Sequence, residues 1–137
     1  MSYILDTDHI SLYQHGYPSV FQKVNNLRKE QLFVTIISLE EQLRGRLAVI
    51  RNPQNITLPN AYRNFHTTYR FFSEMNVLDF DHRALTYYQN LKKQKIRIGS
   101  QDLKIAAIAL THKMTLTTRN TKDFCQMTGL TLEDWTT

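Results

Sequence analysis

The chain has 137 residues, of which 42% are hydrophobic and 21% are charged, and this balance is that of a globular protein rather than a disordered one. No apolar run approaches the roughly 18 residues that span a bilayer, and the first residues lack the pattern of a secretory signal, so we expect no membrane association. The net charge of +5 favours a polyanionic partner, and a lone Cys125, which forms no internal disulfide, suits the reducing cytoplasm.

Short apolar segments alternate with longer segments that carry apolar residues three and four positions apart. The short segments predict buried strands over 3–5, 32–36, 77–80 and 114–117. The longer segments predict helices over about 19–28 and 38–50, around 65–72 and 84–91, and over 103–110. This alternation predicts an α/β fold with a central, mostly parallel sheet flanked by helices. No repeat or linker interrupts it, so we expect residues 1–137 to form one domain.

Polar side chains follow the ends of the predicted strands. Asp6 comes directly after the first strand, and Glu41 and Asp102 lie in the opening turns of two helices. Asn120 and Asp123 follow the strand over 114–117. Parallel sheets bind ligands beyond the carboxyl ends of their strands, so we expect these residues to share one mouth. Crowded carboxylates raise one another's pKa, and oxygen ligands without His or Cys favour Mg²⁺ or Mn²⁺ over zinc.

Each carboxylate also has a structural explanation. Asp6 is suited to cap a short helix, and Ser38 with Glu41 has the spacing of a capping box. Asp102 gains from the helix dipole whatever its function, and Asp123 is also explained as an ordinary surface acid. The joint position of these residues, rather than any one of them, predicts a site.

Four segments place these acids in order along the chain: Ile4-Leu5-Asp6-Thr7-Asp8, Ser38 to Gly45, Ile98 to Ala107, and Leu116 to Phe124. They resemble the four motifs of the PIN-domain family. The final residues, up to Trp135, are similar to the end of VapC-type toxins, in which a last strand leads to a Trp. The resemblance covers essentially the whole chain and implies a PIN-like fold with about five strands.

The resemblance also implies an Mg²⁺-dependent endoribonuclease that acts as the toxin of a type II toxin–antitoxin pair. Its partners would be an RNA substrate, a cognate antitoxin and a second copy in a homodimer. Carried over residue by residue, it implies that Asp6, Asp102 and Glu41 hold the metal.

Glu41 is preferred to its neighbour Glu40 because Glu41 has the family's separation from Gly45. Glu40 instead has the spacing to pair with Arg44 on a solvated helix face. The same helix is expected to turn three leucines towards the core: Leu39, Leu43 and Leu47.

Two positions depart from the family pattern. Asp8 stands where this group often has Asn, and it either keeps a hydrogen-bonding role or adds charge to the site. Asn120 stands where many PIN domains have a fourth acid, with Asp123 three residues later. The number of metal ions therefore stays open at one or two.

The expected reaction is hydrolysis by a metal-activated water, with Glu41 or Asp123 orienting the water or accepting its proton. It should leave a 3′-hydroxyl and a 5′-phosphate. The basic residues that flank the motifs are candidates for RNA contact, and each is also explained as solvated surface: Arg44, Arg46, Arg51, Lys92 and Lys93.

Two other functions fit parts of the sequence. One is a non-catalytic PIN-like module that binds RNA or a protein. The other is a haloacid-dehalogenase-like phosphatase that uses Asp6 and Asp8, although the downstream acidic pair of that class is missing and the chain is short for it.

Overall fold

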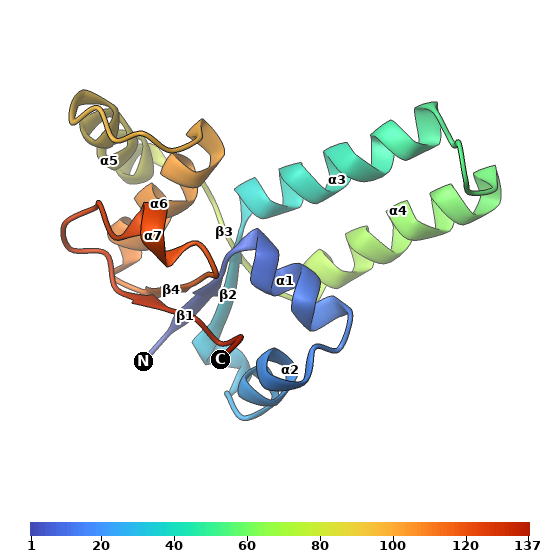
Figure 1. Ribbon diagram of the computed structural model, residues 1–137, viewed down its shortest axis with the longest axis horizontal. Helices are drawn as coiled ribbons and strands as arrows, with labels where there is room; N and C mark the ends of the chain where they lie inside the picture. Colours follow the sequence, from blue (N-terminus) through green and yellow to red (C-terminus); the bar gives the residue numbers. More distant parts are fainter.

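The computed structural model describes residues 1–137 and contains one parallel sheet with helices on both faces (Figure 1). The five strands are β1 (Tyr3–Leu5), β2 (Leu32–Thr35), β3 (Asn76–Leu78), β4 (Thr115–Thr117) and β5 (Leu132–Glu133). Their order in the sheet is β3-β2-β1-β4-β5, and every neighbouring pair is parallel. The predicted α/β class and strand number are confirmed, with strand ends shifted by one or two residues.

Seven helices connect the strands: α1 (Thr7–Gln14), α2 (Pro18–Asn25), α3 (Ile36–Arg51), α4 (Leu58–Ser73), α5 (His82–Lys93), α6 (Ser100–His112) and α7 (Thr121–Phe124). A short 3-10 turn, Lys29–Gln31, leads into β2. None of these helices is long and apolar enough to cross a membrane.

Two apolar clusters cover the two faces of the sheet. Successive residues of a strand point to opposite faces, and accordingly Ile4 belongs to one cluster and Leu5 to the other. The first cluster is built around α6, whose residues 105–109 are all fully buried, as its apolar sequence predicts. The second cluster joins α1, α2 and the end of α4 to Trp135 near the carboxyl terminus.

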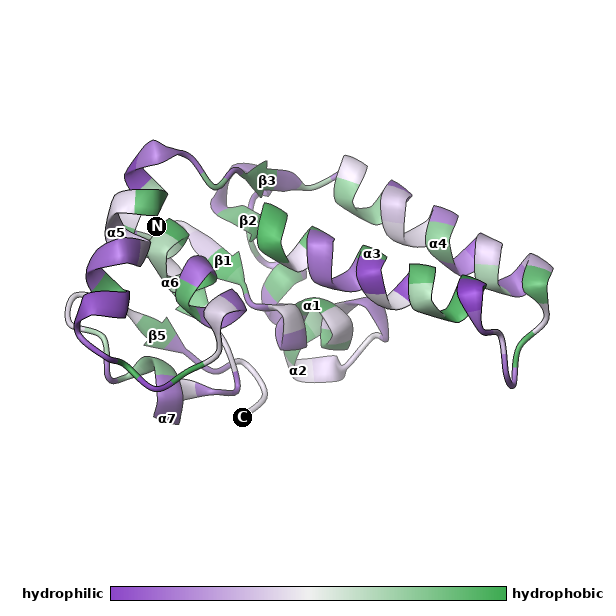
Figure 2. Ribbon diagram, turned by 90° about the horizontal axis from the view of Figure 1, so that it is seen from above, coloured by the Kyte–Doolittle hydropathy of each residue, from purple (hydrophilic) through white to green (hydrophobic).

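Helices α3 and α4 pack along each other and extend past the sheet as an arm, which is seen in both ribbon views (Figures 1 and 2). Leu39 is partly buried against the second cluster, but Leu47 is 40% exposed. The prediction that Leu47 faces the core is therefore wrong. Beyond its first turns α3 has left the sheet, and one neighbouring helix cannot cover a complete apolar stripe.

The alternative explanation of Ser38 and Glu41 as a capping box does not hold. Helix α3 begins at Ile36, directly after β2, and its N-cap is Thr35, whose side chain accepts a hydrogen bond from the Ser38 backbone N–H at 3.2 Å. Because Thr35 caps the helix, the side chains of Ser38 and Glu41 are available for contacts outside α3.

The contrast between core and arm predicts different costs for the same substitution. Leu91→Ala, at a side chain 4% exposed in the first cluster, should lower the free energy of unfolding by about 2–5 kcal/mol through lost burial and a residual cavity. Leu47→Ala on the arm should cost less than about 1 kcal/mol. Denaturant unfolding followed by circular dichroism measures both, and equal losses would contradict the exposed position of Leu47.

Candidate active site

Asp6 lies at the carboxyl end of β1 and is the N-cap of α1. Its Oδ1 accepts a hydrogen bond from the Thr7 backbone N–H at 2.8 Å, so the capping explanation is confirmed. Its Oδ2 accepts a second hydrogen bond from the Thr118 hydroxyl, also at 2.8 Å, just beyond the end of β4. Only 5% of the residue is exposed. Capping accounts for one oxygen, and the other faces the end of a neighbouring strand.

Burial and nearby negative charges raise the pKa of Asp6 to about 7. Burial is the larger cause, followed by the charge of Asp8, and Asp102 adds a smaller effect in the same direction. The hydrogen bonds from Thr118 and Thr7 act against this rise without cancelling it. Without a bound cation, the ionised form of Asp6 is therefore disfavoured, as is expected for a buried carboxylate that has no positive charge beside it.

Asp102 lies in the first turn of α6 and is partly buried. Burial raises the pKa of this carboxyl, and the charges of Glu41, Asp123 and Asp8 raise it further. Since Asp102 also acts on Asp6, the structure brings the predicted acidic residues into one electrostatically linked group. We call these residues the acidic mouth: Asp6, Asp8, Glu41, Asp102 and Asp123.

Glu41 and Glu40 face different surroundings. Glu41 Oε1 accepts a hydrogen bond from the Thr7 hydroxyl at 2.8 Å, which joins α3 to α1 beside Asp6. Glu40 binds Arg44 at 2.8 Å, as its spacing predicts, and also accepts a hydrogen bond from Gln101 Nε2 at 2.9 Å. Glu41 thus belongs to the acidic mouth, whereas Glu40 connects the outer surfaces of α3 and α6.

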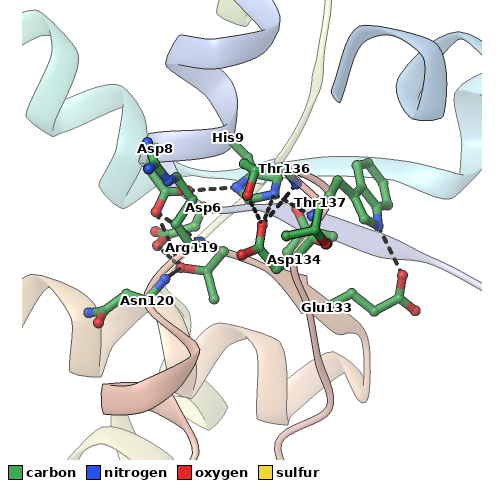
Figure 3. Close-up of polar contacts among 12 residues, drawn as sticks. Asp6, Asp8, His9, Arg119, Asn120, Glu133, Asp134, Thr136 and Thr137 are labelled. Carbon is green, nitrogen blue, oxygen red and sulfur yellow. Dashed lines mark hydrogen bonds and ion pairs between the residues drawn. The ribbon is translucent and has the colours of Figure 1, made fainter. Parts of the chain in front are cut away.

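Asn120 and Asp123 lie together after β4, where Asn120 Nδ2 donates to Asp123 Oδ2 at 3.1 Å. Asp8 is held by different groups. Its Oδ1 lies 2.7 Å from His9 Nδ1, and its Oδ2 accepts a hydrogen bond from the Arg119 backbone N–H at 3.1 Å (Figure 3). Asn120 therefore supports Asp123, and Asp8 is fixed from two sides.

The donor set of the acidic mouth suits a hard divalent cation. No Lys, Arg or His forms an ion pair with Asp6, Glu41, Asp102 or Asp123, so their charges have no internal compensation. No three His, Cys, Asp or Glu side chains are arranged closely enough to make a complete metal-binding group by themselves. Mg²⁺ does not require one, because it takes one or two carboxylates and fills its remaining positions with water and substrate oxygens. The chemistry of these oxygen donors therefore fits that ion.

Sequence reasoning missed the hydroxyl groups that hold these acids. Thr7 Oγ1 contacts both Glu41 and Ser38 Oγ at 2.8 Å, and Thr118 joins Asp6 to the loop after β4. Their positions in the sequence could have indicated this role, because Thr7 lies within the first motif and Thr118 directly follows a strand. Nothing in the sequence indicates the role of His9, which is fully buried beside Asp8.

Several of the candidate RNA-binding residues have partners within the protein. Arg44 pairs with Glu40, Arg46 Nε donates to Thr68 Oγ1 at 3.0 Å, and Lys92 Nζ lies 5.3 Å from the centre of the Tyr88 ring. Arg51 at the end of α3 and Lys93 at the end of α5 are exposed.

Comparison with known proteins identifies the family of the chain. Residues 3–130 match the model of the PIN domain. Ribonuclease VapC2 of Haemophilus influenzae is 30% identical over 114 residues, which cover 73% of this chain and 83% of the relative. The tRNA(fMet)-specific endonuclease VapC of Shigella flexneri is 25% identical over 139 residues, 98% of each chain. In the solved VapBC-1 structure from nontypeable H. influenzae, a chain 28% identical superimposes over 100% of both chains with a TM-score of 0.78. The chain therefore belongs to the PIN-domain family, among its VapC-type members.

Proposed function

We propose that this protein is a metal-dependent endoribonuclease that acts as the toxin of a VapBC-type toxin–antitoxin pair. The observation that carries the proposal is the acidic mouth, in which burial and carboxylates from separate elements raise the pKa of Asp6 and of Asp102. No basic side chain forms an ion pair with Asp6, Glu41, Asp102 or Asp123. The names of the relatives, ribonuclease and tRNA-specific endonuclease, support the same reaction class.

In this proposal Asp6 and Asp102 would be the first ligands of Mg²⁺, with Mn²⁺ as a substitute, and Glu41 would complete the set directly or through a bound water. When bound, the ion supplies Lewis-acid activation of the scissile phosphate and of the attacking water. Asp123, kept in place by Asn120, and Glu41 are the carboxylates available to orient that water and accept its proton. Asp6 releases its own proton when the cation binds, because metal ligands must be ionised.

RNA has to approach a mouth whose own charge is negative. The bound cation lowers that charge, and the exposed Arg51 and Lys93 offer phosphate contacts at a distance from the carboxylates. Arg44, Arg46 and Lys92 remain candidates for RNA contact, and they would have to exchange their present internal partners for phosphate. These contacts would position RNA without selecting its sequence.

The proposal includes two protein partners, a cognate antitoxin and a second copy of the chain, and a place of action in the cytoplasm. Similar solved structures come from complexes named VapBC, including those of Rickettsia felis and Salmonella typhimurium. This chain also has a groove of about 740 Å³ between α1, α2 and α4, separate from the acidic mouth, with Phe21 and Phe71 among its lining residues. Such a partly apolar surface is suited to a protein partner.

The two alternative functions make different predictions. A phosphatase of the haloacid dehalogenase type would form a phosphoaspartate on Asp6, and the PIN-domain match speaks against that class. A non-catalytic module would bind RNA without cutting it.

Substitutions in the acidic mouth should abolish cleavage without unfolding the protein. Asp6→Asn and Glu41→Gln each replace a metal-binding carboxylate by an amide, a poor Mg²⁺ ligand, and should lower kcat by at least about 100-fold. Glu40→Gln is the matched control, because a Gln oxygen still accepts the hydrogen bond from Gln101, and it should stay within about threefold of wild type. Cleavage of total bacterial RNA by purified protein, with 5′-end mapping, measures all three.

The ends of the products test the attacking group. Water as the nucleophile leaves a 3′-hydroxyl and a 5′-phosphate, whereas a 2′,3′-cyclic phosphate would exclude the proposed scheme. Equal toxicity of wild type and Asp6→Asn after induction in bacteria would count against catalysis and in favour of a binding module.

The raised pKa of Asp6 predicts how pH and Mg²⁺ act on stability. The folded protein holds this proton up to a pH of about 7, whereas the unfolded chain releases it near the ordinary value of 3.8. The metal-free protein should therefore lose stability as the pH rises from about 4 to about 7, and the raised pKa of Asp102 acts in the same direction.

Because Mg²⁺ competes with these protons, its affinity should increase towards neutral pH and then level off. Thermal unfolding with millimolar Mg²⁺ or with chelator should show a larger gain in Tm at about pH 8 than at about pH 5. Asp6→Asn should remove most of this difference. A gain in Tm that is the same at both pH values would rule out proton-linked binding at Asp6.

A further inference from the structure

His9 is a fully buried histidine in the first turn of α1, and both of its ring nitrogens have partners. Nδ1 lies 2.7 Å from Asp8 Oδ1, in the acidic mouth. Nε2 accepts a hydrogen bond from the backbone N–H of Trp135, 126 residues away in sequence, at 3.0 Å. Figure 3 shows the imidazole between the Asp8 carboxylate and the carboxyl-terminal segment.

These two contacts determine where the imidazole carries its proton. A backbone N–H only donates, so Nε2 must present its lone pair to Trp135 and cannot be protonated. The single proton of the neutral ring is then on Nδ1, where it points at Asp8. Asp134 does not compete for the ring, because its Oδ1 is 3.8 Å from Nε2 and already accepts from the backbone N–H and hydroxyl of Thr136 at 2.9 and 2.6 Å.

The backbone N–H that fixes this tautomer is held rigidly. Trp135 is 3% exposed in the second core cluster, and its ring lies 5.3 Å from that of Tyr3 on β1. The indole Nε1 donates to Glu133 at 2.9 Å. The donor is therefore part of the packed core and not of a loose chain end.

Asp8 connects this histidine to the centre of the acidic mouth. Its Oδ2 accepts from the Arg119 N–H and lies 3.4 Å from the Thr118 hydroxyl, the same hydroxyl that donates to Asp6. The Asp8 side chain is 33% exposed, so water or a cation can reach it, whereas Asp6 is 5% exposed. The negative charge of Asp8 also raises the pKa of Asp6 more than that of Asp102 does.

We propose that His9 is a positioning residue that uses its Nδ1 proton to hold the Asp8 carboxylate beside Asp6, with Trp135 as the backbone anchor that orients the ring. The inference rests on the proposed function, because its consequence is a stronger cation site. With Oδ1 held by the imidazole and Oδ2 by Arg119, Asp8 cannot rotate away, and its charge stays where the cation would bind.

Substitution of His9 by Asn or by Gln distinguishes this positioning role from that of an ordinary core histidine. In His9→Asn the amide occupies the position of Nδ1, so it can still donate to Asp8, but the Trp135 N–H loses its acceptor. In His9→Gln the amide reaches the position of Nε2, so it can accept from Trp135, but Asp8 loses its donor. Each variant loses one hydrogen bond and some packing, so both should lose similar thermal stability.

The two variants should differ in cation binding and in turnover. In calorimetric titration with MgCl₂, His9→Gln should bind Mg²⁺ about tenfold more weakly than wild type, the usual cost of removing a group that orients a ligand, whereas His9→Asn should stay within about threefold. At fixed Mg²⁺ and below the unfolding temperature of each variant, kcat should follow the same order with little change in KM for RNA. His66→Gln, at an exposed position on α4, is the control and should match wild type.

Nitrogen-15 NMR of the histidine ring gives a measurement that does not depend on activity. It should show His9 neutral and protonated on Nδ1 in wild type. Protonation on Nε2 would overturn the proposal, as would equal Mg²⁺ affinity in His9→Asn and His9→Gln. If wild-type protein itself neither binds Mg²⁺ nor cuts RNA, the proposed function fails first; if wild type is active and the two variants do not differ, only the role of His9 fails.

Discussion

Burial of Asp6 among other carboxylates is the constraint on which the rest of this site depends. In the sheet order β2-β1-β4, the end of β1 lies between the start of α3 and the loop after β4. Asp6 therefore has acidic neighbours on both sides, while the packed sheet beneath excludes water. A surface cluster would relax by turning its side chains outwards. Here burial prevents that motion for Asp6, so a bound cation would relieve the unfavourable energy at the centre of the group.

The groups that hold these carboxylates are mostly neutral. Thr7 holds Glu41, Thr118 holds Asp6, and Asn120 holds Asp123. Hydroxyl and amide donors fix the direction of a carboxylate without neutralising it, whereas an Arg in the same place would have formed an ion pair and removed the reason to bind a metal. Because Thr and Asn stand in these places instead of basic residues, the carboxylates keep the negative charge that the proposed metal binding requires.

The sequence predicted the fold and the site well where a structural rule depends on residues that are close together in the chain. Buried parallel strands leave short apolar runs, and the rule that ligands bind beyond strand ends is enough to group Asp6, Glu41 and Asp102 from the sequence alone. Prediction from the sequence failed where contacting residues are far apart in the chain or where a helix extends beyond the core. Leu47 has the periodicity of a core residue, but its helix has moved past the sheet. The cap of α3 depended on where β2 ends, which the apolar run over 32–36 placed one residue too late.

His9 illustrates the limit most clearly, because its partner is a backbone N–H and so no residue type at position 135 could have revealed the contact. The contact also shows that the site is assembled from both ends of the chain. The Thr118 backbone N–H donates to the backbone carbonyl oxygen of Glu133 at 2.9 Å, so β5 supports the loop that carries Thr118 and Asn120. Two residues later Trp135 orients His9. The carboxyl-terminal segment from β5 to Trp135 thus supports Asp6 through Thr118 and, in the proposed role of His9, Asp8 as well. A disturbance of this segment would reach both carboxylates at once, even though none of its own residues has to touch the substrate.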